Sequence, residues 1–309
     1  MAEPPVLIAG PTASGKSALA VALAGRLGGA VVNADSQQVW RDWRVLTARP
    51  SAGEEARVPH HLYGHRDGRA AYSTGDWLRE MAPLLDRLAG EGRRAIVVGG
   101  TGLYFTALTE GLVAIPPVPA EVRQGVEAIG AGGREALAAA LTAEDPATAA
   151  RLDLANPART ARALEVVRAT GRGLSAWQDD PAPPLVSDAV RLALMPDPDW
   201  LDARIARRLE AMAAGGALDE AEAARALPRG APALKALGAA EFIAHVEGRL
   251  ALDEALARAV LATRRYAKRQ RTWIRGRLAG WARLEAEDLD TAVGMAMTTI
   301  AGTTPETSR

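Results

Sequence analysis

The feature that most constrains the fold is the eight-residue segment GPTASGKS at positions 10–17. Its two glycines, its lysine and its final hydroxyl residue fit the pattern of a phosphate-binding loop. Residues 6–9 before it form a short apolar run typical of a buried strand, and residues 18–27 after it have a helical pattern. In such a strand–loop–helix unit, backbone N–H groups at the helix N-terminus surround a phosphate. The segment therefore predicts a phosphate site, with a glycine-rich turn as the alternative.

Lysine is scarce in this chain, and its positions support the same interpretation. Of 37 basic residues only Lys16, Lys235 and Lys268 are lysines, and the rest are arginines. A compact ammonium ion is not replaced by a planar guanidinium where a point charge must approach a phosphate. We therefore expect Lys16 to bind phosphate oxygens and Ser17 to hold Mg²⁺.

Composition narrows the class of protein. The chain has 309 residues, 48% of them hydrophobic, and its high alanine and low phenylalanine content favours a helical core. The absence of cysteine excludes disulfides and thiolate metal sites and fits a reducing cytoplasm. No apolar run approaches about 18 residues, and the N-terminus lacks the basic start of a signal peptide. We therefore expect a cytoplasmic protein that has no membrane partner. We also expect it to act as a monomer.

Strand and helix patterns alternate along the chain. Four short apolar runs predict buried strands at residues 6–9, 30–33, 95–98 and 190–195. Helical patterns lie between them and after them. This alternation predicts a parallel sheet flanked by helices, an α/β fold of the P-loop NTPase type.

A proline-rich break at residues 115–119 begins a segment with helical patterns only, which a second break at 181–184 closes. We predict an all-helical insertion over residues 116–184, within a catalytic core formed by residues 1–115 and 185–297. Helices are predicted in the second part of that core at 199–214, 218–227 and 252–277. The tail over residues 298–309 is predicted to be disordered.

Polar residues follow the second and third predicted strands. Asp35 comes shortly after residues 30–33, and Gly99-Gly100-Thr101-Gly102 follows residues 95–98. Because the carboxyl ends of parallel strands meet at one edge of a sheet, both groups are expected near the phosphate loop. Asp35 could bind Mg²⁺, take a proton or cap the next turn. The third strand lacks the acidic residue usual in phosphate-loop ATPases, which argues against ATP hydrolysis.

A basic segment lies toward the C-terminus. Residues 255–284 contain nine Lys and Arg and no Asp or Glu. On a helix, Arg264, Lys268, Arg271 and Arg275 share one face. A solvated helix normally mixes charges, so this stretch favours a polyphosphate partner such as nucleic acid. A second basic group in the predicted insertion consists of Arg151, Arg159, Arg162 and Arg168.

Together these motifs resemble the tRNA dimethylallyltransferase family, also called tRNA isopentenyltransferase. The resemblance rests on the order and spacing of motifs across residues 6–280, with Trp40 in place of a usual Tyr, and Ala239 and Ala240 in place of usual aromatic and basic residues. The motifs, besides the phosphate loop, are DSQQ at 35–38, TARP at 47–50, VPHHL at 58–62, and the segments 98–104, 156–165 and 263–275.

The resemblance implies transfer of a dimethylallyl group from dimethylallyl diphosphate to the exocyclic amine of the adenosine 3′ to the anticodon, in tRNAs that read codons beginning with U. It implies Mg²⁺ as cofactor and the tRNA anticodon stem-loop as partner, with Asp35 as general base and Thr101 contacting the reacting groups. The diphosphate would be bound by Gly10, Pro11, Thr12, Ala13, Ser14, Gly15, Lys16, Ser17 and Arg208. The tRNA would be bound by Asp35, Ser36, Gln37, Gln38, Thr101, Arg123, Arg159, Arg162, Lys235, Lys268, Arg269, Arg271, Trp273 and Arg275.

Three alternatives stay open on the sequence alone. A small-molecule kinase with the same core would need an acidic residue after the third strand. A prenyltransferase that modifies free adenine nucleotides would not need the basic C-terminal segment. A nucleotide-regulated RNA-binding protein would perform no chemistry and would tolerate the loss of Asp35.

Overall fold

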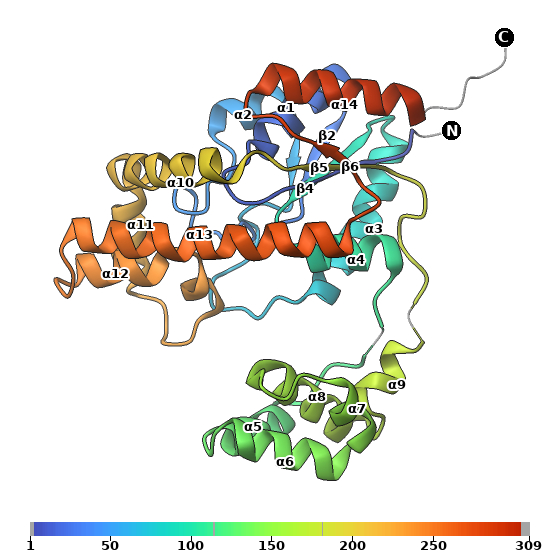
Figure 1. Ribbon diagram of the computed structural model, residues 1–309, viewed down its shortest axis with the longest axis vertical. Coiled ribbons are helices and arrows are strands. Elements are labelled where there is room, and N and C mark those ends of the chain that lie inside the picture. Colours follow the sequence, from blue (N-terminus) through green and yellow to red (C-terminus); the bar gives the residue numbers. More distant parts are fainter. Residues whose placement is uncertain (1–2, 114, 181, 304–309) are drawn as a thin grey trace. The chain divides into compact units, whose positions relative to one another are not determined.

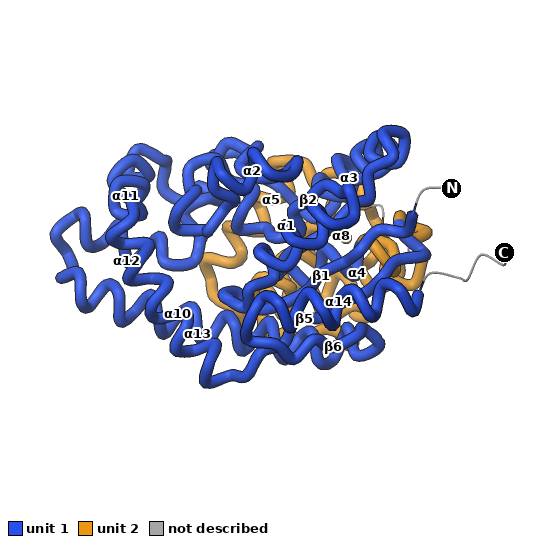
Figure 2. The backbone as a smooth tube through the Cα atoms, turned by 90° about the horizontal axis from the view of Figure 1, so that it is seen from above, with its two compact units in different colours: residues 1–107, 186–309 blue, residues 108–185 orange. Residues whose placement is uncertain are grey.

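The computed structural model describes residues 3–113, 115–180 and 182–303. The chain forms two compact units, a core unit of Met1–Ala107 with Val186–Arg309 and a helical unit of Leu108–Leu185 (Figure 2). Residues 116–184, the segment predicted as an insertion, lie inside the helical unit. In the described ranges no helix combines the length and the apolar character needed to span a bilayer.

A parallel sheet forms the centre of the core unit, with the strand order β3-β2-β4-β1-β5-β6 and only parallel pairings. The central strand β1 places Val6 opposite Ile96 of β4 on one side and Val190 of β5 on the other. The predicted α/β fold and its four strands are therefore confirmed, while β3 and β6 are too short to have been predicted. The strands are β1 Val6–Ala9, β2 Ala30–Asn33, β3 His60–His61, β4 Ala95–Gly99, β5 Val190–Leu194 and β6 Ala282–Leu284.

Helices α1 (Lys16–Arg26) and α14 (Leu289–Thr303) pack together with the strands in one hydrophobic core, and they run side by side in Figure 1. The predicted disorder from residue 298 is wrong for residues 298–303, which belong to α14. Ala296 and Ile300 lie one helical turn apart and are both buried in this core, so the helix is stabilised beyond residue 298. Residues 304–309 of the predicted tail lie outside the described residues.

Helices α3 (Thr74–Gly90) and α4 (Gly102–Glu110) are anchored at the carboxyl end of the sheet. The fully buried Trp77 of α3 stacks on Tyr104 of α4, with ring centroids 4.4 Å apart. Trp77 Nε1 also donates a hydrogen bond of 2.9 Å to the carbonyl of Asn33, the last residue of β2. These contacts fix the backbone immediately before Asp35.

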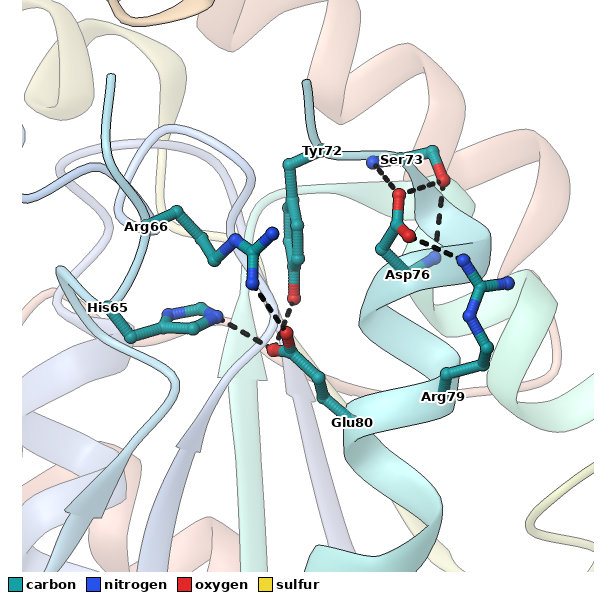
Figure 3. A network of polar contacts seen from close by, with 7 residues as sticks. All are labelled: His65, Arg66, Tyr72, Ser73, Asp76, Arg79 and Glu80. Atoms are coloured by element: carbon teal, nitrogen blue, oxygen red, sulfur yellow. Dashed lines mark hydrogen bonds and ion pairs between the residues drawn. The ribbon is translucent and has the colours of Figure 1, made fainter. Parts of the chain in front are cut away.

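A polar cluster centred on Glu80 of α3 holds the loop that follows β3 (Figure 3). The Glu80 carboxylate accepts hydrogen bonds from Tyr72 Oη at 2.8 Å and Arg66 Nη1 at 3.2 Å, and it lies 2.7 Å from His65 Nε2. Burial and the hydrogen bond to Glu80 raise the pKa of Tyr72. Because the Tyr72 ring packs edge-on against Trp40, the cluster also supports the segment that follows Asp35.

A second hydrophobic core joins the C-terminal helices to the loop after β2, through the buried side chains of Trp43, Leu209 and Phe242. The 26-residue helix α13 matches the predicted helix over 252–277. Its buried face carries mostly small residues, which allow close packing against neighbouring elements. The helices and turns of this region are α10 Pro198–Met212, η1 Ala213–Ala217, α11 Leu218–Ala224, η2 Pro232–Lys235, α12 Ala239–Val246 and α13 Leu252–Arg277, and a short helix α2 (Ala52–Arg57) lies earlier in the core unit.

In the helical unit, the helices surround a small apolar core that includes Val126, Leu137, Leu141, Ala163 and Leu164. The Asp-Pro and Asn-Pro pairs in its sequence mark helix starts, because Asp145 and Asn156 cap α7 and α8 and the prolines occupy the first turn. The helices are α5 Ala120–Gly130, α6 Arg134–Glu144, α7 Pro146–Arg151, α8 Pro157–Thr170 and α9 Leu174–Gln178.

Candidate active site

The phosphate loop connects β1 to α1 at the carboxyl edge of the sheet. Gly15 precedes α1 with φ of 95°, a left-handed conformation that favours glycine. Ala13 also has a positive φ of 64°, which a residue with a side chain adopts only under constraint. The Lys16 side chain is buried, and its Nζ donates to the Pro11 carbonyl at 3.1 Å. The loop therefore curls around the start of α1, and the Ser17 position at the helix start is exposed.

Two cations and one carboxylate gather at this loop. Burial lowers the pKa of Lys16 from 10.5 to about 8, the carboxylate of Asp35 partly opposes this shift, and Arg208 adds to it. Burial likewise lowers the pKa of Arg208 to about 10, again opposed by Asp35. A bound anion would favour the charged forms of both cations. The site is therefore electrostatically suited to a polyanion.

Arg208, and not Arg204, belongs to this site. Arg208 lines the same pocket as Thr12 and Asp35. The Arg204 guanidinium instead lies 5.0 Å from the centre of the Trp200 ring, in a cation–π contact. The two arginines are one helical turn apart on α10, so the sequence alone could not distinguish them.

Asp35 is held rigidly just after β2 and is 7% exposed. Its backbone N–H donates to Asn33 Oδ1 at 2.8 Å, and Asn33 Nδ2 donates to the Asp35 carbonyl and to the Leu62 carbonyl, each at 3.0 Å. One carboxylate oxygen, Oδ1, accepts from the Gln37 N–H at 3.0 Å. Asp35 thus caps the following turn with Oδ1, while Oδ2 faces the turn after β4.

The turns after β2 and β4 touch each other beside Asp35. The Ser36 N–H donates to Thr101 Oγ1 at 2.8 Å, and this hydroxyl donates to Ser36 Oγ at 3.1 Å. A β-carbon on Gly100 would lie 3.1 Å from Asp35 Oδ2, so a side chain there would crowd the carboxylate. The predicted neighbours Asp35, Ser36 and Thr101 are therefore brought together.

A pocket with about 40 Å³ of space for water-sized spheres opens between the phosphate loop and the C-terminal helices of the core unit. One part of its wall is apolar, and the other carries the carboxylate of Asp35 and the half-buried guanidinium of Arg208. Such a surface suits a ligand with a hydrocarbon portion and an anionic portion. The lining residues are Thr12, Ala13, Asp35, Gln37, Leu46, Thr47, Ile205, Arg208, Leu209, Met212, Leu237, Thr263 and Tyr266.

The two glutamines of the DSQQ segment have different surroundings. Gln37 lines the pocket, and its Oε1 accepts from the Leu237 N–H at 2.8 Å. Gln38 donates from Nε2 to the carbonyls of Thr47 and Ala48, both at 2.8 Å. Both amide hydrogens of Gln38 are therefore used to hold the loop around Thr47, whereas Gln37 borders the space a ligand would occupy.

Basic side chains gather along α13. Arg264, which the sequence places on the basic stripe, lies 3.5 Å from Asp202 of α10. The Trp273 ring covers Gly102, where a β-carbon would lie 2.2 Å from it. Within the described part of the chain, no ion pair is found for the basic residues predicted to bind tRNA in the core unit, which are Lys235, Lys268, Arg269, Arg271 and Arg275.

In the helical unit, ion pairs neutralise most of the predicted basic group. Arg151 pairs with Asp179 at 2.9 Å, Arg162 with Glu165 at 3.3 Å, and Arg168 with Glu144 at 2.6 Å. By contrast, Arg123 and Arg159 are exposed, and among the described residues no ion pair involves them. These two are the cations most available to a polyanion on this unit.

The sequence did not identify two residues that shape the site. Asn33 fixes the backbone of Asp35, as described above. Gln270 of α13 accepts from the Thr12 N–H at 2.8 Å and donates to the Gly100 carbonyl at 2.9 Å. A signal for Gln270 was present, because it is the one amide on the buried face of α13, whose other residues are Ala255, Ala259, Thr263, Ala267 and Ile274.

Comparison with known proteins finds matching families and similar relatives over most of the chain. The chain matches the IPP transferase family over residues 38–277 and the isopentenyl transferase family over residues 5–62. It is 56% identical over 283 residues to the tRNA dimethylallyltransferase of Cereibacter sphaeroides (strain ATCC 17029), covering 90% of this chain and 87% of the relative. It is 55% identical to that of Dinoroseobacter shibae, covering 91% of this chain and 94% of the relative.

Two solved structures are similar over nearly the whole chain. The full-length tRNA isopentenylpyrophosphate transferase of Bacillus halodurans superposes with a TM-score of 0.70 at 34% identity, covering 97% of this chain and 96% of that one. A eukaryotic dimethylallyltransferase acting on tRNA superposes with a TM-score of 0.79 at 26% identity, covering 93% of this chain and 74% of that one.

Proposed function

Because the chain belongs to the IPP transferase family, we propose that it is a tRNA dimethylallyltransferase of the kind its relatives are named for. It transfers the dimethylallyl group from dimethylallyl diphosphate to the exocyclic amine of the adenosine 3′ to the anticodon, in tRNAs that read codons beginning with U. The observation that carries this proposal is the carboxylate of Asp35, which lies near the buried Lys16 and lines a partly apolar pocket together with the half-buried Arg208.

The cations act on the leaving group. As the allylic C–O bond breaks, its electron pair and negative charge move onto the diphosphate. Lys16, Arg208 and the N-terminus of α1 offset this charge in a site with little water, where electrostatic stabilisation is strong. The apolar side chains of Ile205, Leu209 and Met212 suit the hydrocarbon portion of the donor.

Asp35 acts on the acceptor. The amine nitrogen of adenine forms a bond to the allylic carbon and must lose a proton, which Asp35 Oδ2 accepts. The Gln37 N–H donates to Oδ1, and hydrogen bonds between the Asn33 side chain and the Asp35 backbone hold the main chain, so that the carboxylate need not reorganise during the reaction. Thr101 contacts the reacting groups from the adjacent turn.

Mg²⁺ fits the residues at the loop. The Ser17 hydroxyl at the start of α1 is an oxygen donor of the kind Mg²⁺ prefers, and this ion commonly takes its remaining ligands from substrate phosphates and water. When bound, it would add positive charge next to the diphosphate. Ser17 is the residue that would hold it.

The RNA is bound mainly by cations that form no ion pair among the described residues, with Arg162 as the exception because it pairs with Glu165. Lys268, Arg269, Arg271 and Arg275 of α13 contact backbone phosphates of the anticodon stem-loop, and Trp273 offers a ring for base stacking. Lys235, Arg123, Arg159 and Arg162 add further phosphate contacts, Ser36 and Gln37 lie next to the target base, and Gln38 holds their loop. The target adenosine lies in a single-stranded loop, from which it leaves the stack at low cost. We expect the enzyme to act as a cytoplasmic monomer.

The proposal is tested by incubating the protein with Mg²⁺, labelled dimethylallyl diphosphate and an unmodified tRNA that has adenosine 3′ to its anticodon. The matched control is the same tRNA with guanosine at that position. Label in the first tRNA and not in the second is the expected result. Label in free adenine nucleotides only, or consumption of ATP without prenyl transfer, would contradict it.

A further inference from the structure

Gln270 connects segments that are far apart in the chain. It lies on α13, is 6% exposed, and uses both ends of its side-chain amide. Its Oε1 accepts from the Thr12 N–H of the phosphate loop at 2.8 Å, and its Nε2 donates to the Gly100 carbonyl, after β4, at 2.9 Å. One side chain therefore bridges the phosphate loop and the turn that faces Asp35.

This environment differs from that of its neighbours on the same helix. Arg269 is exposed and Lys268 is exposed, whereas Gln270 points to the inside of the core unit. Its Oε1 and one Nε2 hydrogen are engaged by backbone groups, and at 6% exposure the amide offers little surface to a base or a phosphate. Gln270 therefore acts by holding protein segments of the site and not by binding the ligand.

The turn after β4 is shaped to receive this amide. A β-carbon on Gly100 would lie 2.2 Å from Gln270 Nε2, so any side chain at position 100 would displace the amide. The same β-carbon would lie 3.1 Å from Asp35 Oδ2. The lack of a side chain at Gly100 thus allows Gln270 and Asp35 to approach one backbone segment from two directions.

We propose that Gln270 is a positioning residue: it holds the phosphate loop and the Gly100 turn at a fixed separation, and it links both to the basic helix α13. This proposal rests on the proposed function, since it assigns to Gln270 the placement of the diphosphate relative to Asp35. Without the amide, the Thr12 N–H and the Gly100 carbonyl lose their buried partners. The phosphate loop then binds the diphosphate in a less well-defined position.

The test uses the full chain and inorganic diphosphate with Mg²⁺ as the probe, so that it does not require prenyl transfer. Three variants are compared with the wild type: Gln270→Met, which keeps the length but removes both hydrogen bonds, Gln270→Glu, and the control Ala257→Met at an exposed position of α13. Gln270→Met is expected to weaken diphosphate binding by roughly ten- to a hundredfold, because two partly buried hydrogen bonds that hold the loop are lost. The affinity for tRNA should change less than about twofold, because phosphate contacts dominate that affinity.

Gln270→Glu gives a pH-dependent change in affinity that a loss of packing alone would not produce. A protonated Glu has the shape and the hydrogen-bonding capacity of Gln, whereas an ionised one cannot donate to Gly100 and repels Asp35 and the diphosphate. Lys16, Asp35 and Arg208, the charged groups of the same site, are unchanged from the wild type. Burial near Asp35 should raise the pKa of the new Glu above its ordinary value of about 4.3, so the ratio of variant to wild-type affinity should recover at least about tenfold as the pH falls from 8 to 5, while the ratio for Gln270→Met stays constant.

The outcomes are distinct. Diphosphate affinity within twofold of the wild type in Gln270→Met would overturn the positioning role, as would a pH-independent ratio in Gln270→Glu. An equal loss in Ala257→Met would also overturn it, by showing a general effect of changing the helix. A wild-type protein that binds diphosphate but transfers no dimethylallyl group would instead contradict the proposed function and leave the Gln270 result standing.

Discussion

Replacing Lys16 by methionine is predicted to stabilise the ligand-free protein while removing its ability to bind the diphosphate. Lys16 is 8% exposed, and burial lowers the pKa of its ammonium from 10.5 to about 8. At pH 7 the side chain is charged in both the folded and the unfolded chain, but the folded chain bears the cost of burying the charge. Methionine has a similar length and no charge, so it removes this cost.

The pKa shift of Lys16 sets the size of the expected change in the free energy of unfolding. A shift from 10.5 to about 8 corresponds to a cost of about 3 kcal/mol, at about 1.4 kcal/mol per pKa unit. Methionine also loses the hydrogen bond from Lys16 Nζ to the Pro11 carbonyl, worth about 1 kcal/mol. The net expectation at pH 7 is that Lys16→Met raises the free energy of unfolding by about 2 kcal/mol.

The lowered pKa of Lys16 also fixes the direction in which stability changes with pH. Between pH 8 and pH 10.5 the unfolded chain retains the Lys16 proton that the folded chain has released, so this group makes wild-type stability rise with pH. The advantage of Lys16→Met over the wild type should therefore be full at pH 7 and should shrink above pH 8.

Urea unfolding of both proteins at pH 7, 8 and 9.5 measures this difference, with tryptophan fluorescence reporting on the buried Trp43 and Trp77 of the core unit. A variant no more stable than the wild type at pH 7, or a difference that does not change with pH, would refute the reasoning.

Three further predictions concern the acceptor, the RNA and the loop after β3. Asp35→Asn should lower kcat on the order of 100- to 10,000-fold in single-turnover assays, with tRNA affinity unchanged in a filter-binding control; near-normal turnover would exclude Asp35 as the base. Replacing Lys268, Arg271 and Arg275 together by glutamine should reduce the slope of log K against log salt for tRNA by about 2, and an unchanged slope would count against α13 as the RNA surface. Glu80→Gln should lower the free energy of unfolding by about 1–2 kcal/mol, because it replaces a charged acceptor shared by several donors; equal stability in urea would show that the cluster does not hold the loop.

The sequence predicted the fold well where patterns are local. The phosphate loop, the four longer strands and helix 252–277 follow from apolar runs and helical periodicity within short windows. The sheet edges did not follow, because His60–His61 is only two residues long and Ala282–Leu284 contains an arginine. Helix α14 was not predicted, and its last residues were assigned to a disordered tail, because Ile300 packs in a core formed with distant segments that no local pattern shows.

The sequence predicted only part of the site, because several contacts there join residues that are distant in the chain. Asp35 and Thr101 could be placed together because parallel strands end at a common edge. Gln270 could not be assigned to the phosphate loop, since its partners lie 258 and 170 residues away in the chain. The choice between Arg204 and Arg208, which share one side of α10, likewise depends on which turn of this helix lies at the pocket, and only the structure shows that.

Identifying the nucleotide that acquires the label tests the proposed function most directly. After reaction with dimethylallyl diphosphate and Mg²⁺, the tRNA is digested to nucleosides and analysed by mass spectrometry, with the Asp35→Asn variant as the parallel sample. The prediction is one isopentenyl unit on the exocyclic nitrogen of the adenosine 3′ to the anticodon, formed by the wild type and almost absent with the variant. A modification on another atom or nucleotide, or equal yields from both proteins, would contradict the proposed roles of the pocket and of Asp35.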